Sequence, residues 1–434
     1  MEVSPRKVLY VSHNHPVIRP GGAEAYAFEL HEAMRDETDW ESLFLARTGP
    51  PFSTASRYHE GTLLTGVDDR DPGQYFFYTE LSDYDWLLNS TREKSTITTH
   101  LRDFLLAQQP DVVHFQHTLF IGLEAIREVR NTLPDAAIVY TLHEFLPICH
   151  RHGQLLRATD EEPCMEESPR RCHECFPEVS PQEFFMRKRF IQSQMSFVDL
   201  FIAPSKFLGE RYVDWGIPAE KIRVEEYGRL PLSYVPSTPR RKRRNRFGFF
   251  GQFSHYKGVN VVLQAAKRLA AEDVDAKIWL HGANLEIQPQ EFQDEFAELV
   301  EASGESVVLV GRYDHDQLGS LMENVDWVIV PSRWWENSPL VIQEAFMHGR
   351  PVICSDIGGM AEKVTDGVDG LHFRVGDPED LARVIAEAAG SAQQWRNLTA
   401  NIRPIYPMRA HVGELLKLYD DLLAREPVAT GAAS

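Results

Sequence analysis

Short apolar runs alternate with helical segments along nearly the whole chain, and this alternation constrains the fold more than any other feature. "KVLYVS" at residues 7–12 is an apolar run, and "RPGGAEAYAFELHEAM" continues it with two glycines and then helical spacing. This order predicts a strand, a glycine turn and a helix. Strands that alternate with helices form parallel sheets covered by helices on both faces. The chain is therefore expected to be an α/β protein.

The alternation occurs twice. "DLFIAPSKF" from Asp199 and "DWVIVPSRW" from Asp326 align without a gap, which indicates two related, doubly wound halves. A chain of 434 residues is also too long for one ordinary core. The other expected strands lie at 42–46, 111–117, 136–143, 199–205 and 221–228, and then at 246–251, 277–282, 306–311, 326–332 and 351–355.

These runs give a plan of two domains. We expect an N-terminal Rossmann-like domain at 1–230, with a Cys-rich insertion at 147–178, and a second Rossmann-like domain at 247–405. Residues 231–246 hold three prolines and a dense basic run, which indicates a linker. Its basic residues are either solvated or in contact with an anionic lipid or acceptor. An amphipathic helix at 406–425 is expected to pack on the N-terminal domain.

The composition excludes some classes of function. A net charge of −19 argues against binding to nucleic acid. The first residues lack the apolar core of a signal peptide, and no run of about 18 apolar residues predicts a spanning helix. We therefore expect a cytoplasmic protein. Peripheral contact with the inner face of a membrane stays open, because it needs no spanning segment.

The stretch "WWENSPLVIQEAFMHG" at 334–349 predicts a short helix at about 339–348. Ser338 is a good N-cap and Pro339 suits the first helical position, while Gly349 suits the C-terminal end. The free N–H groups at such a helix start favour a phosphate.

Two glutamates, Glu336 and Glu344, lie on either side of this helix start. A carboxylate accepts hydrogen bonds from neighbouring hydroxyls, so the pair suits a ligand with a hydroxylated ring at each end of a diphosphate. A nucleotide sugar is such a ligand. The alternative is that Glu336 interacts only with the helix dipole and that Glu344 faces solvent.

A longer stretch, "PSRWWENSPLVIQEAFMHGRPVICSDIGGMAEKVTDGVDG", resembles the signature region of retaining glycosyltransferases of family four. The resemblance includes "PGGAEAYAFELHEAM", "TLHE", "FFGQFSHYKGVNVVLQA" and "VVLVGRY", and it covers almost the whole chain. It implies the GT-B fold, in which two doubly wound Rossmann-like domains face each other across a cleft. The domain at 1–230 would be the acceptor domain, and the domain at 247–405 would be the nucleotide-sugar donor domain.

The resemblance assigns roles to the donor-binding residues. It implies that Glu344 binds the ribose hydroxyls and that Glu336 contacts the hydroxyls of the transferred sugar. The backbone around Asn337, Ser338, Pro339 and Leu340 would lie against the diphosphate and the sugar.

The family's diphosphate site is incomplete in this sequence. Lys257 matches the lysine that binds the diphosphate, but Gln252 stands where the family usually has an arginine. Glutamine donates a hydrogen bond without neutralising charge. His255, Arg312 and Arg333 are the candidates that compensate for the lost charge.

Other matches lie near the transferred sugar and the base. Gly21 and Gly22 match a turn where the backbone approaches the ligand closely. His143 in "TLHE" matches a histidine that faces the transferred sugar, and Arg312 and Tyr313 in "VGRY" match the loop that meets the base. His114 and His117 are weaker candidates for the site.

The resemblance implies transfer of a sugar, such as a hexose, from a nucleoside diphosphate sugar to an acceptor hydroxyl with retention of configuration. His143, Glu336 and Lys257 would be the catalytic residues, with no catalytic metal and with the leaving diphosphate helping to take the acceptor proton. The acceptor is expected to be a glycan, a lipid-linked sugar or a small molecule. The alternatives are another GT-B enzyme, such as a nucleotide-sugar epimerase, and a non-catalytic nucleotide-sugar binding protein.

Four cysteines cluster directly after "TLHEFLP". Cys149, Cys164, Cys172 and Cys175 are separated by fourteen, seven and two residues. Four thiolates suit a tetrahedral zinc ion, and a metal would hold this polar stretch in place. We therefore predict a structural zinc site. An iron–sulfur cluster, free thiols and a disulfide are the alternatives, with His150, His152 and His173 as substitute ligands.

Overall fold

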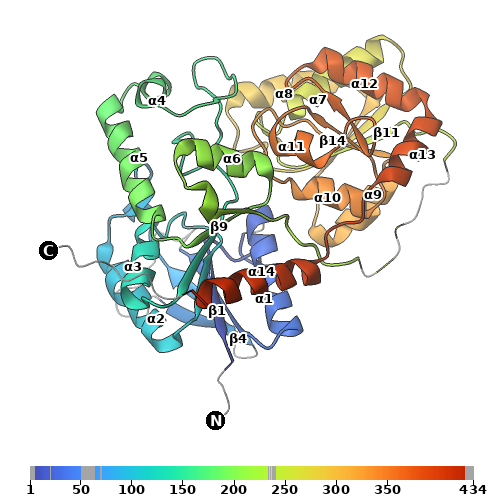
Figure 1. Cartoon of the computed structure of the whole chain (residues 1–434). Helices are drawn as coiled ribbons and strands as arrows, with labels where there is room; N and C mark the ends of the chain where they lie inside the picture. The colour runs from blue at the N-terminus through green and yellow to red at the C-terminus, as the bar shows by residue number, and fades with distance from the viewer. Residues whose placement is uncertain are drawn as a thin grey trace. The chain divides into compact units, whose positions relative to one another are not determined.

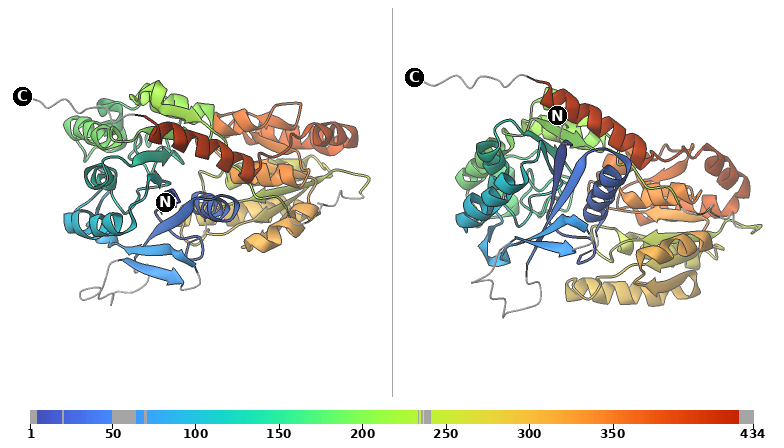
Figure 2. Two further views of the ribbon diagram at one scale, coloured as in Figure 1. Left: turned by 60° about the horizontal axis from the view of Figure 1, so that its bottom comes forward. Right: turned by 90° about the horizontal axis from the view of Figure 1, so that it is seen from below.

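The computed structural model describes residues 5–19, 21–49, 64–68, 71–232, 234, 236 and 241–425, and it divides into two compact units. Unit 1 comprises Met1–Pro231 and Tyr406–Ser434, and unit 2 comprises Leu232–Ile405. The last helix, α14 (Met408–Leu423), belongs to unit 1 and packs against α1 (Gly22–Glu37), as both views of Figure 2 show. In the described part of the chain, no helix is long and apolar enough to cross a membrane.

Unit 1 is built on one eight-stranded sheet (Figure 1). Its strand order is β10-β9-β8-β7-β1-β2-β4-β3, and every neighbouring pair is parallel except β3 with β4. The strands are β1 (Lys7–Ser12), β2 (Glu41–Thr48), β3 (Leu64–Asp68), β4 (Asp71–Tyr78), β7 (Val112–Phe115), β8 (Ala137–Thr141), β9 (Leu200–Ala203) and β10 (Ile222–Val224).

The remaining elements of unit 1 are helices and one small hairpin. The hairpin pairs β5 (Tyr84–Asp85) with β6 (Ser90–Thr91). The helices are η1 (Leu81–Asp83), η2 (Thr96–Leu101), α2 (Arg102–Gln108), α3 (Glu124–Thr132), α4 (Pro169–Cys175), α5 (Pro181–Met195), α6 (Lys206–Trp215) and η3 (Ala219–Lys221).

Unit 2 is built on a six-stranded sheet in which all neighbours are parallel. Its order is β13-β12-β11-β14-β15-β16, from β11 (Arg246–Phe250), β12 (Lys277–His281), β13 (Val307–Gly311), β14 (Trp327–Val330), β15 (Val352–Ser355) and β16 (Gly370–Phe373). Its helices are α7 (Val259–Ala271), α8 (Gln290–Ser303), η4 (Gly304–Ser306), η5 (His315–Gln317), α9 (Leu318–Asn324), α10 (Leu340–Met347), α11 (Gly358–Lys363), α12 (Pro378–Gly390) and α13 (Ala392–Asn401).

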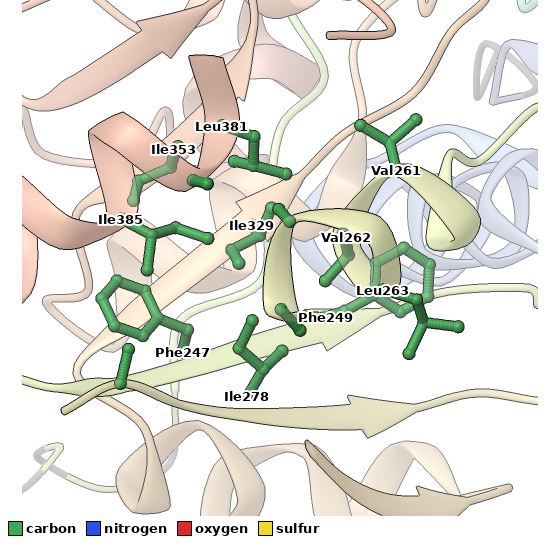
Figure 3. Close-up of a cluster of buried hydrophobic side chains, with 14 of the residues drawn as sticks. Phe247, Phe249, Val261, Val262, Leu263, Ile278, Ile329, Ile353, Leu381 and Ile385 are labelled. Atoms are coloured by element: carbon green, nitrogen blue, oxygen red, sulfur yellow. The ribbon is translucent and has the colours of Figure 1, made fainter. Parts of the chain in front are cut away.

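The core of unit 2 shows why these apolar runs become strands (Figure 3). Phe247, Phe249, Ile278 and Ile329 from the sheet pack against side chains of α7 and α12, and all four are almost fully buried. Strands that are covered on both faces need nearly continuous apolar sequence, because neither face meets water. The α/β class expected from the alternation is confirmed.

The predicted linker at 231–246 is only partly described, because residues 233, 235 and 237–240 lie outside the described residues. Arg244 before β11 is buried, and its guanidinium donates to Asp326 at 3.1 Å and lies 4.0 Å from the centre of the Trp395 ring. The interpretation as a solvated linker is therefore wrong for Arg244, because its charge stabilises a buried carboxylate of unit 2.

Each sheet has one place where the chain reverses the direction in which it adds strands. In unit 2 this switch point lies between β11 and β14, and the order corresponds to 3-2-1-4-5-6 in chain sequence. In unit 1 it lies between β1 and β7. Loops beyond the carboxyl ends of strands at a switch point diverge, which leaves room for a ligand.

Candidate functional site

Lys257 and Glu336 meet at the switch point of unit 2. Lys257 follows β11 and Glu336 follows β14, and the ammonium nitrogen lies 2.5 Å from the carboxylate oxygen Oε1. The same oxygen accepts hydrogen bonds from the Ser332 hydroxyl and the Trp334 indole N–H, each at 2.8 Å. The carboxylate is thus held in one orientation by three donors.

Glu336 is ionised in this setting. Its side chain is 12% exposed, and burial alone would raise the pKa of its carboxyl. The charge and hydrogen bond of Lys257, together with the two neutral donors, instead lower the pKa below its ordinary value. The site therefore holds a fixed cation and a fixed anion side by side.

Two glycines allow these loops to approach each other. Gly258 has a φ of +71°, and a Cβ there would overlap the carbonyl oxygen of Pro331. Gly359 donates its N–H to the Glu336 carbonyl at 2.8 Å, and a Cβ there would overlap the Asn337 carbonyl. A larger residue at position 258 would push the loops after β11 and β14 apart, and one at position 359 would push α11 away from the loop after β14.

The helix after Glu336 starts later than the sequence indicates. α10 spans Leu340–Met347, and its N-cap is Pro339 without a side-chain hydrogen bond. The prediction that Ser338 caps the helix is wrong, because the chain is still extended at Pro339, and Ser338 itself is buried. A pocket lies at this helix start, lined among others by Lys257, Ser332, Glu336, Pro339 and Leu340.

Glu344 lies half-buried on α10 and faces the loop after β13. Burial raises the pKa of Tyr313, and the carboxylate of Glu344 raises it further, so the two side chains are within electrostatic reach. Glu344 is therefore partly exposed and partly covered, and the alternative that it faces solvent stays open. Gly349 follows α10 with a φ of +66°, as a residue at the end of a helix often has.

The candidates for the diphosphate charge differ in their surroundings. Gln252 is exposed, and Arg312 is 70% exposed with its guanidinium 3.7 Å from Glu286. Arg333 follows β14 three residues before Glu336, and its guanidinium contacts the ring of His255 at 3.1 Å. Arg333 and His255 thus lie on the two loops that also carry Glu336 and Lys257.

In unit 1, the glycine turn lies at the switch point. Gly21 is the N-cap of α1, and Gly22 is its first residue. A Cβ at Gly21 would overlap the carboxylate of Glu24, which is buried and lies 3.0 Å from the His13 ring. The glycine therefore leaves room for a buried carboxylate of this unit.

His143 follows β8, and both of its ring nitrogens are hydrogen-bonded. Nδ1 lies 2.6 Å from the Tyr227 hydroxyl and Nε2 lies 2.9 Å from the Gln116 side-chain oxygen. Burial, followed by the charges of His117 and His13, keeps the pKa of His143 well below its ordinary value. His143 is therefore a neutral, oriented imidazole.

The two weaker histidine candidates separate in the structure. The His117 ring is 4.3 Å from the His13 ring and 3.3 Å from the Glu144 carboxylate, so it joins the cluster at the switch point. His114 is buried between the Tyr419 hydroxyl at 2.6 Å and the Thr141 hydroxyl at 2.7 Å. His114 therefore connects α14 with the sheet through hydrogen bonds and does not line the site.

The four cysteines of the insertion are all free, half-buried thiols. Cys164 and Cys172 each lie within electrostatic reach of other cysteines of the group. Among the residues that the structure describes, however, no three His, Cys, Asp or Glu side chains are placed to hold a metal ion. The arrangement does not support the zinc prediction.

Sequence reasoning missed several residues of these sites. Trp334 and Ser332 position Glu336, while His13, Glu24 and Glu144 build the cluster in unit 1. The sequence could have indicated these residues by their positions. They lie directly after strands β1, β8 and β14 or at the start of α1, at the carboxyl edge of a sheet.

Two family models match the chain in succession. The model described as "Glycosyltransferase Family 4" matches residues 20–225, and the model described as "Glycosyl transferases group 1" matches residues 244–390. The lipopolysaccharide 1,2-N-acetylglucosaminetransferase of Salmonella typhimurium is 23% identical over 277 residues, which is 63% of this chain and 62% of that protein. The glycogen synthase of Thermus thermophilus is 27% identical over 165 residues, 35% of this chain and 36% of that protein. The matched part of the chain thus spans less than two thirds of the length of each of these relatives.

Solved structures share the fold. Anabaena Alr3699/HepE in complex with UDP and glucose matches with a TM-score of 0.65 at 17% identity, covering 96% of this chain and 100% of that chain. Sucrose-phosphate synthase of Thermosynechococcus elongatus matches with a TM-score of 0.69 at 17% identity, covering 96% and 99%. These likenesses confirm the predicted GT-B fold, and the names of the relatives agree with the glycosyltransferase function expected from the sequence.

Proposed function

We propose, from the premise that this chain belongs to the GT-B glycosyltransferases, that it transfers a sugar from a nucleoside diphosphate sugar to an acceptor hydroxyl with retention of configuration. The observation that carries the proposal is the Lys257–Glu336 pair at the switch point of unit 2. A cation beside the start of a helix suits a diphosphate, and a fixed carboxylate suits sugar hydroxyls.

The contacts within unit 2 support one role for each residue. Lys257 and the N–H groups at the start of α10 would stabilise the negative charge that develops on the leaving diphosphate. Glu336, ionised and fixed by Ser332 and Trp334, would accept hydrogen bonds from the transferred sugar. Glu344 would accept from the ribose hydroxyls beside Tyr313 of the base-binding loop.

In unit 1, we propose that His143 orients the transferred sugar without acting as a base. A neutral imidazole whose two nitrogens are already paired is a poor proton acceptor. The leaving diphosphate would then take the acceptor proton, and no metal would take part in the chemistry. Relatives named for lipopolysaccharide and glycogen synthesis support a glycan acceptor, and a cytoplasmic location remains part of the proposal.

Substitutions in the pair test the proposal. The donor is first found by incubating the full chain with UDP-, ADP- and GDP-glucose and with UDP-N-acetylglucosamine, and by following release of the nucleoside diphosphate. Glu336→Ala should lower transfer by a factor of about 100 or more, while the affinity for the nucleoside diphosphate changes less than about threefold. Lys257→Ala should weaken both transfer and diphosphate binding.

Glu301→Ala on α8 and Lys267→Ala on α7 are matched controls, because both side chains are exposed and lie outside the pocket. Undiminished transfer by Glu336→Ala would overturn the role of Glu336. Conversion of the donor sugar to its epimer without any acceptor would favour the epimerase alternative, and NMR of the product's anomeric proton tests retention.

We also propose that zinc binds Cys149, Cys164, Cys172 and Cys175. The support is a buried charge: Arg187 is 2% exposed and donates only to the carbonyls of residues 146–148, with no carboxylate in salt-bridge distance among the described residues. Its electrostatic neighbours include Cys149 and Cys172, which are neutral as thiols, and then the Glu167 carboxylate, which is not in salt-bridge distance. Four thiolates around Zn²⁺ carry two net negative charges and would balance the guanidinium. The thiols would have to close around the ion as it binds.

Metal analysis tests the zinc proposal. Protein purified without a histidine tag should contain about one equivalent of zinc, and Cys172→Ser with Cys175→Ser should remove it. Less than half an equivalent of any metal in the unsubstituted chain would overturn the proposal. Cys354→Ser is the control, because this fifth cysteine is buried in unit 2.

A further inference from the structure

Four rings from three separate segments of unit 1 form an aromatic cluster that the proposed function has not used. They are Tyr84 and Trp86 from the β5–β6 hairpin, Phe120 from the loop after β7, and His152 from the loop after β8. The Trp86 ring lies 5.3 Å from Tyr84, 5.4 Å from Phe120 and 5.1 Å from His152, each nearly perpendicular to it. Such edge-to-face contacts fix the orientation of every ring.

The cluster is buried on one side and open on the other. Tyr84 is 4% exposed and forms the base of the cluster, and the Arg47 guanidinium lies 4.9 Å from the centre of the Phe120 ring. Trp86, by contrast, is 38% exposed, and His152 is exposed as well. The tryptophan is therefore a fixed ring that presents apolar surface to solvent.

The backbone is strained around this cluster. Eight non-glycine residues of the described chain have a positive φ, and Asn89, Phe120, His152 and Leu155 are four of them, with φ between 48° and 61°. Non-glycine residues rarely adopt this conformation, and those that do concentrate at functional sites. The strain is held by surrounding contacts: Thr79 donates to the Phe120 carbonyl at 2.8 Å, and the N–H of Leu123 donates to the Asn89 carbonyl at 3.0 Å.

Polar groups lie on the same loops as the rings, and Glu144 is within electrostatic reach of Tyr84. The loop that carries Phe120 also carries His117, and the loop that carries His152 also carries Glu144, 3.3 Å from His117. The Glu144 carboxylate is packed so closely on Gly153 that a Cβ there would overlap it. The Tyr84 hydroxyl is buried without a hydrogen-bond partner among the described residues. Both loops follow neighbouring parallel strands, so these groups share the carboxyl edge of the sheet.

This combination favours a sugar ring as the occupant. A pyranose has an apolar C–H face and a rim of hydroxyls, and it needs an aromatic surface beside hydrogen-bonding side chains. An anionic lipid or nucleic acid is disfavoured, because the chain carries a net charge of −19 and Glu144 lies within electrostatic reach of Tyr84. The cluster belongs to unit 1, whereas the Lys257–Glu336 pair belongs to unit 2.

We propose that this aromatic cluster is the acceptor subsite, where Trp86 stacks on a sugar ring of the acceptor and Glu144, held by His117, accepts hydrogen bonds from its hydroxyls. The inference rests on the proposed glycosyltransferase function. It adds the class of acceptor: a glycan or glycoside with an uncharged pyranose at the end that reaches unit 1.

The test measures sugar binding separately from donor binding. The full chain is titrated with methyl α-D-glucopyranoside, N-acetyl-D-glucosamine, D-galactose and maltotriose by saturation-transfer NMR. At least one sugar should bind, and Trp86→Ala should weaken it by about tenfold or more while Trp86→Phe stays within about threefold. Phe185→Ala is the matched control, because Phe185 is a half-exposed ring on α5, outside the cluster.

The outcomes separate the two proposals. Equal sugar affinity for the unsubstituted chain and Trp86→Ala, or no binding of any of the four sugars, would overturn the subsite. Binding of UDP, ADP and GDP is measured in parallel on both chains, with thermal unfolding to confirm that Trp86→Ala is folded. Failure of all three nucleotides to bind the unsubstituted chain would instead overturn the proposed function, whatever the sugars do.

Discussion

The sequences that contain β9 and β14 are similar, with four of nine residues identical, but they lead into different structures. "DLFIAPSKF" leads out of β9, and "DWVIVPSRW" leads out of β14. The two aspartates make equivalent contacts, because each accepts a hydrogen bond from the backbone of a neighbouring strand. Asp199 accepts from the N–H of Ile138 at 2.7 Å, and Asp326 accepts from the N–H of Arg246 at 3.2 Å. The two serines make different contacts. Ser205 caps α6, which starts at the next residue, whereas Ser332 donates to Glu336 at 2.8 Å.

The position of the strand explains this difference. β9 lies beside the edge strand β10, where the chain returns at once as a helix. β14 lies beside β11 at the switch point, and an extended loop separates it from α10. The similarity of the two stretches correctly predicts two doubly wound halves. The two similar strands, however, do not hold equivalent positions in their sheets. A strand-end sequence can therefore serve the fold in one place and the site in another.

The two units also differ in their buried histidines, which predicts different responses to acid. Burial lowers the pKa of six described histidines of unit 1, namely His13, His15, His31, His114, His143 and His150. It lowers the pKa of two in unit 2, His281 and His348. For His114 the value is about 3.

The largest expected effect is selective loosening of unit 1 at mildly acidic pH. A lowered folded-state pKa means that the unfolded chain binds the proton first, so stability is complete above about pH 6.5 and falls as the pH falls below it. Each fully buried histidine costs up to about 1.4 kcal/mol per pH unit. Hydrogen exchange at pH 7.5 and 5.5, corrected for intrinsic rates, should show β7 and β8 losing more protection than β11 and β14.

Glu336 provides the internal contrast for that experiment. The pKa of its carboxyl is lowered, so its contribution to stability is present above the unfolded-state value of about 4.3 and is lost only as the pH falls through the lower folded-state value. Glu336 therefore costs unit 2 no protection at pH 5.5, and the smaller loss expected there comes from His281 and His348. Equal or greater loss in β11 and β14 would contradict the assignment of the acid-sensitive groups to unit 1.

Much of the fold was predictable from sequence because its strands are buried on both faces. The apolar run at 7–12 coincides with β1, and the runs at 111–117 and 326–332 contain β7 and β14. The strands β3 and β4 were not predicted. β4 spans Asp71–Tyr78 and lies near the edge of the sheet, and only Gln74 and Phe77 of its residues are buried. Sequence period is weakest where only part of a strand meets the core.

The site was predictable in part for a different reason. Lys257, Glu336 and Glu344 stood out through the resemblance, and the structure brings the first two into contact. The cap at Ser338 could not be judged from local preference, because the contact of Gly359 with the Glu336 carbonyl holds this segment extended. The His13–Glu24 and His117–Glu144 pairs join distant segments, and no local pattern encodes such contacts.

The smallest expected effect comes from exchanging the serines of the two similar stretches for alanine. Ser205→Ala removes the side-chain acceptor for the N–H of Leu208, so it should destabilise unit 1 by about 1 kcal/mol and leave transfer unchanged. Ser332→Ala should hardly change stability, since Lys257 and Trp334 still hold Glu336. It should nevertheless lower transfer by about tenfold, because two donors fix the orientation of the carboxylate less tightly than three.

Urea unfolding and initial rates of transfer, measured on the same two preparations, decide whether the comparison holds. If both variants lose stability and keep activity, the Ser332 hydroxyl is merely a second cap and the loop after β14 does not depend on it for its catalytic geometry. If Ser205→Ala also lowers transfer, α6 has a part in the site that its position beside the sheet edge does not suggest. We expect Ser205→Ala to lose stability and Ser332→Ala to lose activity. This result would show that the two serines differ because their strands hold different positions in the sheets.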